Sequence, residues 1–418
     1  MVLYNTSFIG PDNRLHHEDI RIDGSRIVGI EASIVPHSDE RCIDSRGYLI
    51  IPALADSHVH TPDTLMKGLF HSIPMTEWCN DSYQGRLQQR LFDFIDTSVG
   101  IDTFETLVLY EYLQYIRHGV GFIVETGQAD DSSYVLQQCA KHIGLKAIID
   151  WYDKIPDIKT GNPNIAIGMH LPEEENLTEE LLKQTVALHK SYKSMPLMTH
   201  CLENSWRLNE IRRKFGKSTV ELMAEHTLLG ANTLLFHCIQ ISDKDIKLIA
   251  HSGASAVCCP VSTMRTGESV MPLAKMLAHG INVAIGTDFL DHDIWECMRF
   301  AYTLMCSTTE IQNLPAFVFA TASRNAAKFA QRAGYEGEIA VGKPADLCFI
   351  EHTLDLDPLI DNDDFSTVLH NLIVSGSKHL VRHLLINGTF ILYDGCCTTL
   401  DEQAITARYK DILHSLGF

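Results

Sequence analysis

Eight short apolar runs, each followed by a longer amphipathic segment, alternate between residues 50 and 334. This alternation predicts βα units that build a parallel sheet. The predicted strands cover residues 50–55, 121–125, 146–150, 165–169, 196–199, 233–236, 254–258 and 281–285. Eight units in about 285 residues have the size of a (β/α)8 barrel. A doubly wound open sheet is the competing architecture, but no glycine-rich phosphate-binding turn follows the first strand.

The two ends of the chain have a different texture from this middle part. Residues 1–49 form short alternating stretches broken by turn residues, which predicts short antiparallel strands. Similar stretches return near the C-terminus, where Asn387-Gly388 predicts a hairpin turn. We therefore expect an α/β protein with a TIM-type (β/α)8 catalytic barrel over residues 50–335. Residues 1–49 and 336–418 would together form a small composite β-sandwich, with a helix at the C-terminus.

Composition limits the classes of partner. The 418 residues include 34 basic and 53 acidic ones, a net charge of −19, and no block of Lys and Arg that could follow a phosphate backbone. Nucleic acid is therefore not expected as a partner, and neither is a membrane, since no run of 18 apolar residues occurs. The 12 cysteines include no C-x-x-C pair, which favours reduced thiols in a cytoplasmic protein. A small-molecule substrate is expected, with homo-oligomerisation left open.

Histidines and one carboxylate stand at the ends of five predicted strands. In a barrel these ends converge on one site, where neutral imidazoles and carboxylates suit a metal such as zinc. The pair in His58-Val59-His60 points to one face of an extended strand, because its members are two residues apart. Each residue alone could be an ordinary core or surface residue, whereas together they predict a metal site. The residues are His58, His60, His170, His200, His237 and Asp288.

Five of these residues belong to four specific motifs: His58-Val59-His60, His200-Cys201-Leu202-Glu203, His237-Cys238 and Gly286-Thr287-Asp288. With them the sequence resembles the amidohydrolase superfamily, in the chlorohydrolase and deaminase branch that includes methylthioadenosine/S-adenosylhomocysteine deaminases. The resemblance runs nearly end to end. It implies a metal-dependent hydrolase of non-peptide C–N bonds. The expected reaction is hydrolytic deamination of an aminated N-heterocycle, in which metal-bound hydroxide attacks and ammonia leaves.

The resemblance also implies the ligands of one divalent ion, namely His58, His60, His200 and Asp288. Zinc is the expected ion, and iron suits the same donors. Asp288 would accept the proton of the attacking water. His237 would hydrogen-bond the nucleophile and the developing oxyanion, or act as a fourth histidine ligand. No lysine ends the fourth strand, so a single ion is the simpler prediction.

Substrate contacts are predicted for Glu203, His170, Trp78 and Phe289. Glu203 would protonate a ring nitrogen of the substrate and later assist the departure of ammonia. The alternative for Glu203 is an exposed carboxylate at a helix start. The resemblance places His170 against the substrate. Trp78 could stack on a flat heterocycle or belong to the core.

The chain departs from the family pattern around the predicted pocket. Leu87 occupies the region where these deaminases carry a glutamate that binds ribose hydroxyls, and Phe289 replaces the glycine that commonly follows the metal-binding aspartate. The substrate is therefore expected to be a nucleobase, a nucleoside or a related heterocycle. Hydrolysis of an amide, an amidine or a C–halogen bond is the runner-up. A catalytically silent binding protein is the alternative from another class.

Overall fold

The computed structural model describes residues 1–95, 100–126, 130–151, 162–289, 291–307, 311 and 313–418. Its centre is a sheet of eight strands, in which each strand lies parallel to the next one along the chain. The strands are β8 (Leu54–Val59), β9 (Val120–Glu125), β10 (Lys146–Trp151), β11 (Ile165–His170), β12 (Leu197–Cys201), β13 (Thr233–His237), β14 (Ser255–Cys258) and β15 (Asn282–Ile285). The predicted βα alternation and the eight-stranded parallel sheet are confirmed.

The sheet closes into a barrel between its first and last strands. The backbone N–H of Asp288, three residues after β15, donates to the carbonyl oxygen of His58 in β8 over 2.8 Å. Val59 and Asp288 also form a parallel bridge. A closed sheet leaves no unpaired edge, so all eight strands bury both faces.

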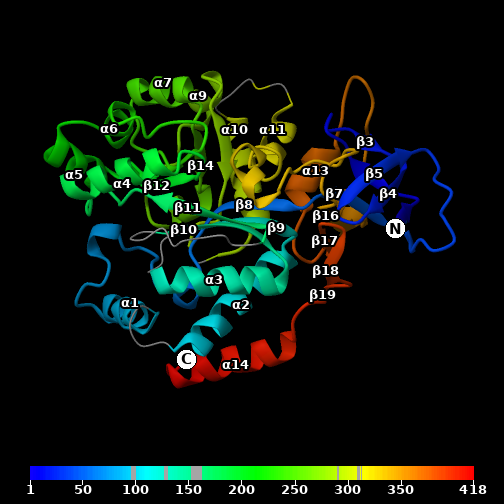
Figure 1. The fold of residues 1–418 in the computed structure, drawn as a ribbon, viewed down its shortest axis with the longest axis horizontal. Coiled ribbons are helices and arrows are strands. Elements are labelled where there is room, and N and C mark those ends of the chain that lie inside the picture. Colours follow the sequence, from blue (N-terminus) through cyan, green and yellow to red (C-terminus); the bar gives the residue numbers. More distant parts are fainter. Residues whose placement is uncertain (96–99, 127–129, 152–161, 290, 308–310, 312) are drawn as a thin grey trace.

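Helices surround the barrel (Figure 1). They are α1 (Tyr83–Asp93), α2 (Ile101–Arg117), α3 (Asp130–Ile143), α4 (Glu179–Ser191), α5 (Ser205–Phe215), α6 (Thr219–Glu225), α7 (Asp243–Ser252), α8 (Pro260–Arg265), α9 (Leu273–Ala278), α10 (Ile294–Cys306), α11 (Leu314–Thr321) and α12 (Ala327–Ala330). Many begin at side-chain caps, as in α7, where Ser242 and Asp245 form a capping box. No helix among the described residues is long and apolar enough to cross a membrane.

The two chain ends meet in separate sheets beside the barrel. A four-stranded sheet has the order β5-β4-β1-β6, and a seven-stranded sheet has the order β19-β18-β17-β16-β7-β2-β3. Their strands are β1 (Val2–Tyr4), β2 (Ser7–Ile9), β3 (Leu15–His16), β4 (Asp19–Asp23), β5 (Arg26–Glu31), β6 (Cys42–Asp44), β7 (Tyr48–Pro52), β16 (Leu347–Glu351), β17 (Val381–Ile386), β18 (Thr389–Tyr393) and β19 (Cys396–Cys397). Phe8, Ile22, Leu347 and Phe349 share one core between them.

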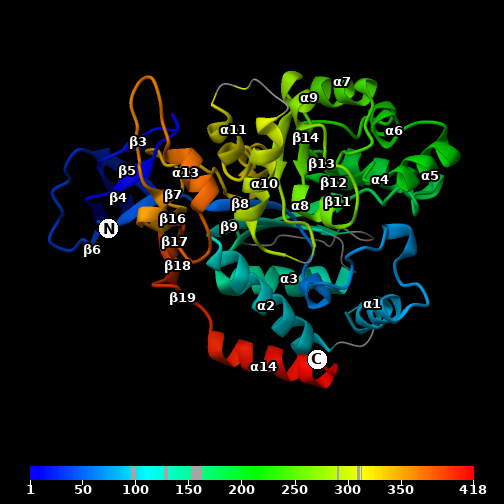
Figure 2. The same ribbon diagram turned by 180° about the vertical axis from the view of Figure 1, so that it is seen from behind.

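The C-terminal segment also holds two helices, α13 (Val368–Ser375) and α14 (Glu402–Ser415). The predicted terminal helix α14 lies along α2 of the barrel (Figures 1 and 2). Tyr409 of α14 stacks on Tyr110 of α2 with ring centres 3.7 Å apart. Arg117 and Glu402 form an ion pair of 3.1 Å between the same helices. The last helix therefore packs against the barrel instead of the sheets.

The first predicted strand differs in detail from the structure. The segment from Tyr48 to Val59, which begins with the apolar run, is divided at Ala53 into β7, which pairs with β16 in the outer sheet, and β8, which opens the barrel. Leu49, Ile50 and Ile51 are as fully buried as the barrel residues. Apolar content alone therefore could not assign them to one of the two sheets. The boundaries at residues 49 and 335 stay a prediction.

Candidate metal centre and active site

Five donor side chains meet at the C-terminal end of the barrel. His58 lies in β8, His200 in β12 and His237 in β13, while His60 and Asp288 closely follow β8 and β15. Oδ1 of Asp288 is 3.2 Å from Nε2 of His58 and 3.3 Å from Nε2 of His60. Nε2 of His60 is 3.2 Å from Nε2 of His200. Donor atoms of His58, His237 and Asp288 lie within 4.8 Å of one another, as do those of His58, His60 and His200.

Some of these buried donor atoms lack hydrogen-bond partners. Both ring nitrogens of His237 have none in the described part of the chain, and Nε2 of His58 contacts Oδ1 of Asp288, another of the donors. Burial lowers the pKa of His58 to about 3 and that of His237 to about 4, so both imidazoles are neutral and can act as ligands. His60 differs, because Asp288 outweighs burial and raises its pKa to about 9. A bound cation would displace that proton.

Three strand exits at this site have a left-handed backbone. Leu202 after β12, His237 at the end of β13 and Asp288 after β15 have φ of 50°, 67° and 67°. Non-glycine residues adopt this conformation at a cost of about 1–3 kcal/mol, and they concentrate at functional sites. The turns redirect the chain immediately after each strand, which lets the side chains converge above the barrel.

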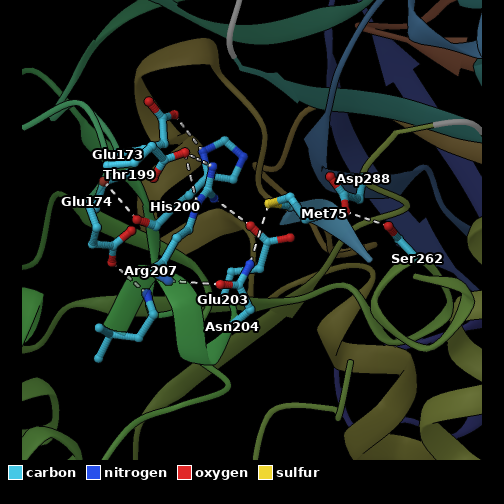
Figure 3. A network of polar contacts seen from close by, with 12 residues as sticks. Met75, Glu173, Glu174, Thr199, His200, Glu203, Asn204, Arg207, Ser262 and Asp288 are labelled. Carbon is cyan, nitrogen blue, oxygen red and sulfur yellow. Dashed lines mark hydrogen bonds and ion pairs between the residues drawn. The ribbon is translucent and has the colours of Figure 1, made fainter. Parts of the chain in front are cut away.

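The carboxylate of Asp288 is anchored on its second oxygen. Oγ of Ser262, in α8, donates to Oδ2 over 2.6 Å (Figure 3). The preceding residue, Thr287, donates from its N–H and its hydroxyl to Asp56 in β8, at 2.9 Å and 2.6 Å. These contacts tie the end of β15 to β8 and leave Oδ1 directed at the histidines.

Glu203 lies beside this cluster in the turn between β12 and α5. Oδ1 of Asn204 accepts from the N–H of Arg207 and caps α5, so Glu203 stands immediately before the helix. Its side chain is 6% exposed, and its Oε2 accepts a hydrogen bond from Nη1 of Arg207. Burial raises the pKa of Glu203 to about 7, although Arg207 opposes the rise. The carboxyl can therefore exchange a proton near neutral pH.

His170 ends β11 next to His200, with ring centres 5.9 Å apart. Its Nδ1 lies 2.8 Å from Oδ2 of Asp150, and its Nε2 lies 3.1 Å from Oε1 of Glu173. Both ring nitrogens are thus engaged within the protein. A contact of this imidazole with substrate stays a prediction, and it would have to displace one of these carboxylates.

Trp78 and Phe289 meet in an aromatic cluster beside the donors. Their ring centres are 5.4 Å apart, and both rings contact Phe70. Phe289 is also 6.5 Å from the His60 ring. A cavity of about 400 Å³ borders this cluster and is lined by Phe70, Ser262 and Phe289 among others. Leu87 lies in α1.

Sequence reasoning missed four charged residues that hold the site, namely Glu173, Glu174, Glu175 and Arg207. Figure 3 shows the network in which they lie. Two signals were present in the sequence. Three consecutive glutamates follow a buried strand almost directly, and an arginine stands four residues after Glu203, at the spacing of a helical ion pair.

Comparisons with known proteins agree with this fold. The chain is 26% identical, over an alignment 442 positions long, to a 5-methylthioadenosine/S-adenosylhomocysteine deaminase from Pyrococcus abyssi, covering 99% of this chain and 97% of that protein. A zinc-bound adenosine deaminase from Xanthomonas campestris superposes with a TM-score of 0.83 at 20% identity, over 99% and 98% of the two chains. A zinc-complexed atrazine chlorohydrolase from Arthrobacter aurescens also gives 0.83, at 17% identity, over 98% and 99%.

The family match covers the barrel and all five donors. The sequence pattern of the Amidohydrolase family matches residues 49–378, which is most of the chain. This range begins just before β8 and includes every strand of the barrel. The resemblance carried by the four short motifs is thereby confirmed, and the chain belongs to the Amidohydrolase family.

Proposed function

We propose that this protein is a hydrolytic deaminase that removes ammonia from an aminated N-heterocycle with the help of one divalent ion. The observation that carries the proposal is the proximity of two groups at one end of the barrel. A cluster of histidines with one carboxylate lies beside a buried carboxyl, Glu203, whose pKa responds to the charges of Asp288 and His60. A metal-ligand cluster next to a protonatable carboxyl suits hydrolysis of a C–N bond.

The donor set fits a zinc ion. Neutral imidazoles and one carboxylate oxygen are its common ligands, and both ring nitrogens of His237 are buried without a hydrogen-bond partner in the described part of the chain. His58, His60, His200 and Asp288 would hold the ion, with His237 as a further ligand or a hydrogen-bonding group. Iron is compatible with the same donors. When bound, the ion supplies a nucleophilic hydroxide near neutral pH, because it lowers the pKa of water to roughly 7–9.

The protein's own residues would transfer the protons and stabilise the charge that develops during the reaction. Asp288, fixed through Oδ2 by Ser262, would take the proton of the attacking water. His237 would hydrogen-bond the attacking oxygen and stabilise the negative charge that develops on it. Glu203, with a pKa near 7, would deliver a proton to a ring nitrogen and thereby make the adjacent carbon electrophilic. The proton held by Asp288 would then pass to the departing amine. Glu203 would regain a proton from the hydroxyl of the tetrahedral adduct as the C–N bond breaks, and would thereby assist the departure of ammonia.

The aromatic cluster favours a flat substrate. Phe289 presents its ring beside His60 and packs against Trp78, and the adjoining cavity of about 400 Å³ has room for a small heterocycle. A relative that spans the whole chain is a 5-methylthioadenosine/S-adenosylhomocysteine deaminase, which supports an aminated purine or a similar ring. Hydrolysis of a C–halogen bond stays the second candidate, since an atrazine chlorohydrolase shares the fold.

The test is a screen for ammonia release by the protein reconstituted with one equivalent of zinc. Aminopurines, aminopyrimidines, pterins and aminotriazines form the panel, with chloride release from chlorotriazines as a parallel assay. His58→Ala is expected to abolish turnover and zinc binding. His251→Ala, an exposed histidine on α7, serves as the matched control and should behave like the parent. A parent protein that binds no divalent ion after reconstitution, or that releases no ammonia from any compound, would overturn the proposal.

A further inference from the structure

Three consecutive glutamates lie in the loop between β11 and α4. They are Glu173, Glu174 and Glu175, and they begin three residues after His170. A run of acidic residues usually faces solvent, but Glu173 and Glu174 are only 7% and 1% exposed. Each of the three bonds to a different point of the segment from His200 to Arg207, which also carries Glu203. Figure 3 shows Glu173 and Glu174 beside this segment.

Glu173 contacts His200, one of the candidate metal ligands. Its Oε1 lies 3.0 Å from Nδ1 of His200 and 3.1 Å from Nε2 of His170. His170 is held in turn by Asp150, at 2.8 Å from its other nitrogen. Because Nδ1 of His200 faces a carboxylate, that nitrogen carries the proton and Nε2 presents its lone pair toward His60. A carboxylate behind a ligating imidazole fixes both its tautomer and its orientation.

Glu174 holds the turn between the two functional residues. Its Oε1 accepts from the N–H of Leu202 over 2.8 Å and from the hydroxyl of Thr219, in α6, over 2.7 Å. Leu202 has the left-handed backbone that redirects the chain after β12. The bond to Glu174 satisfies a buried N–H at a strained position and thereby stabilises this turn.

Glu175 reaches Glu203 through Arg207. Oε1 of Glu175 accepts from Nη2 of Arg207 at 2.7 Å and from Nε at 3.2 Å. The remaining terminal nitrogen, Nη1, donates to Oε2 of Glu203. The guanidinium is planar and its side chain is 10% exposed, so anchoring one edge on Glu175 fixes where the other edge holds Glu203.

We propose that the triplet Glu173-Glu174-Glu175 is the positioning element of the active site. Glu173 orients His200 for metal binding, Glu174 fixes the intervening turn, and Glu175 places Glu203 through Arg207. We assign the three glutamates positioning roles, because each is bonded to a protein group that orients or holds another residue of the site. The part concerning Glu203 rests on the proposed deaminase function, whereas the part concerning His200 requires metal binding alone.

The first experiment measures zinc affinity of the full-length protein by competition with a chromophoric chelator. Glu173→Ala should weaken zinc binding about 10- to 100-fold, the range typical of carboxylates behind metal ligands. The visible absorption bands of the cobalt-substituted protein should shift, because the orientation of one ligand changes. Glu173→Gln keeps an oxygen acceptor and should recover part of the affinity. Glu179→Ala, an exposed glutamate at the start of α4, is the matched control and should change neither quantity.

Parental affinity and unchanged cobalt bands in Glu173→Ala would overturn the role of Glu173. Two equivalents of zinc in the parent and one in the variant would also overturn it, because Glu173 would then be a ligand. Should the alanine variant not fold, the isosteric Glu173→Gln decides, with zinc binding weakened at least about threefold as the expected result. These results do not depend on which substrate the protein uses.

The second experiment compares Glu175→Ala with the parent in ammonia release. Zinc affinity and the cobalt bands should stay unchanged, whereas kcat should fall at least about tenfold. The pH profile should move to lower pH. Without Glu175, the positive charge of Arg207 would act on Glu203 alone and lower the pKa of that carboxyl. An unchanged kcat and pH profile would overturn the role of Glu175. Failure of the parent to release ammonia from any compound would instead count against the proposed function, and would leave the result for Glu173 standing.

Discussion

The backbone N–H of Asp288 donates to the carbonyl oxygen of His58 over 2.8 Å, and this bond both closes the barrel and pairs two of the five donors. The side chains of the same residues lie 3.2 Å apart, from Nε2 to Oδ1. Because one contact serves the fold and the site, the position of Asp288 depends on barrel closure. Substitutions of single residues test the roles of the groups in and around this site.

Glu203→Gln removes the proposed proton donor while it keeps a side chain of the same size. We expect kcat for deamination to fall about 10²- to 10⁴-fold, with zinc content unchanged. Burial raises the pKa of Glu203 to about 7, so activity of the parent should decline as the acid loses its proton above that pH. The variant should lack this decline. Deamination that survives the change unimpaired would remove Glu203 from the mechanism, and Glu180→Gln on exposed α4 controls for charge.

Phe289→Ala should widen the range of substrates. Phe289 lines the cavity beside the donors and packs against Phe70 and Trp78, so its removal leaves space next to His60. We expect kcat/KM for a nucleoside to rise at least about tenfold relative to the free base, since one lost steric clash of about 1.4 kcal/mol has that effect. Phe365→Ala, at an exposed site, should leave the ratio unchanged. An unaltered ratio in Phe289→Ala would show that the ring does not limit substrate size.

Glu125 should make the zinc-free protein less stable at alkaline pH. It ends β9 fully buried, and burial raises its pKa from 4.5 to about 8. The folded state therefore holds a proton that the unfolded chain has already lost. The protonated carboxyl of Glu125 contributes fully to the free energy of unfolding below pH 4.5. This contribution falls between pH 4.5 and 8 and is absent above pH 8. The loss is of the order of 1 kcal/mol per pH unit.

Glu125→Gln tests this linkage, because glutamine can still accept the N–H of Thr61 that Glu125 binds at 3.3 Å. Denaturant unfolding at pH 5, 7 and 9 should show the variant gaining stability over the parent as pH rises. The readout is how the difference in unfolding free energy between the variant and the parent changes with pH, since other buried carboxyls such as Asp56 titrate in both proteins. A difference that stays constant from pH 5 to 9 would contradict the assignment.

A buried ion pair joins the barrel to the outer sheets. Nζ of Lys146 in β10 lies 2.6 Å from Oδ2 of Asp346, just before β16, and the side chains are 0% and 4% exposed. Asp346→Asn should cost about 3–5 kcal/mol of unfolding free energy, because it leaves the lysine charge buried without its partner. Lys146→Met combined with Asp346→Asn should cost less than the sum of the two single changes. Additive effects would deny the coupling. The exposed Lys183–Glu179 pair is the control, with an expected coupling below about 1 kcal/mol.

The sequence predicted the parts of the fold that repeat. The apolar runs located seven of the eight barrel strands, and Asn387-Gly388 located a hairpin turn in which both residues have positive φ. The length of each apolar run and its alternation with amphipathic segments locate the strands, because each barrel strand must bury both faces. The run from Tyr48 to Val59 was not resolved by the same logic, since burial in either of two sheets demands the same apolar residues.

The sequence by itself also singled out the candidate metal ligands and Glu203, because polar residues at the C-terminal ends of barrel strands converge on one site. Only the tertiary structure decided how these groups are held. Glu173 meets His200 across 27 positions in the chain, and Glu175 meets Arg207 across 32. Such contacts leave no local period or spacing to detect. They exist because adjacent parallel strands, β11 and β12, bring their following loops side by side.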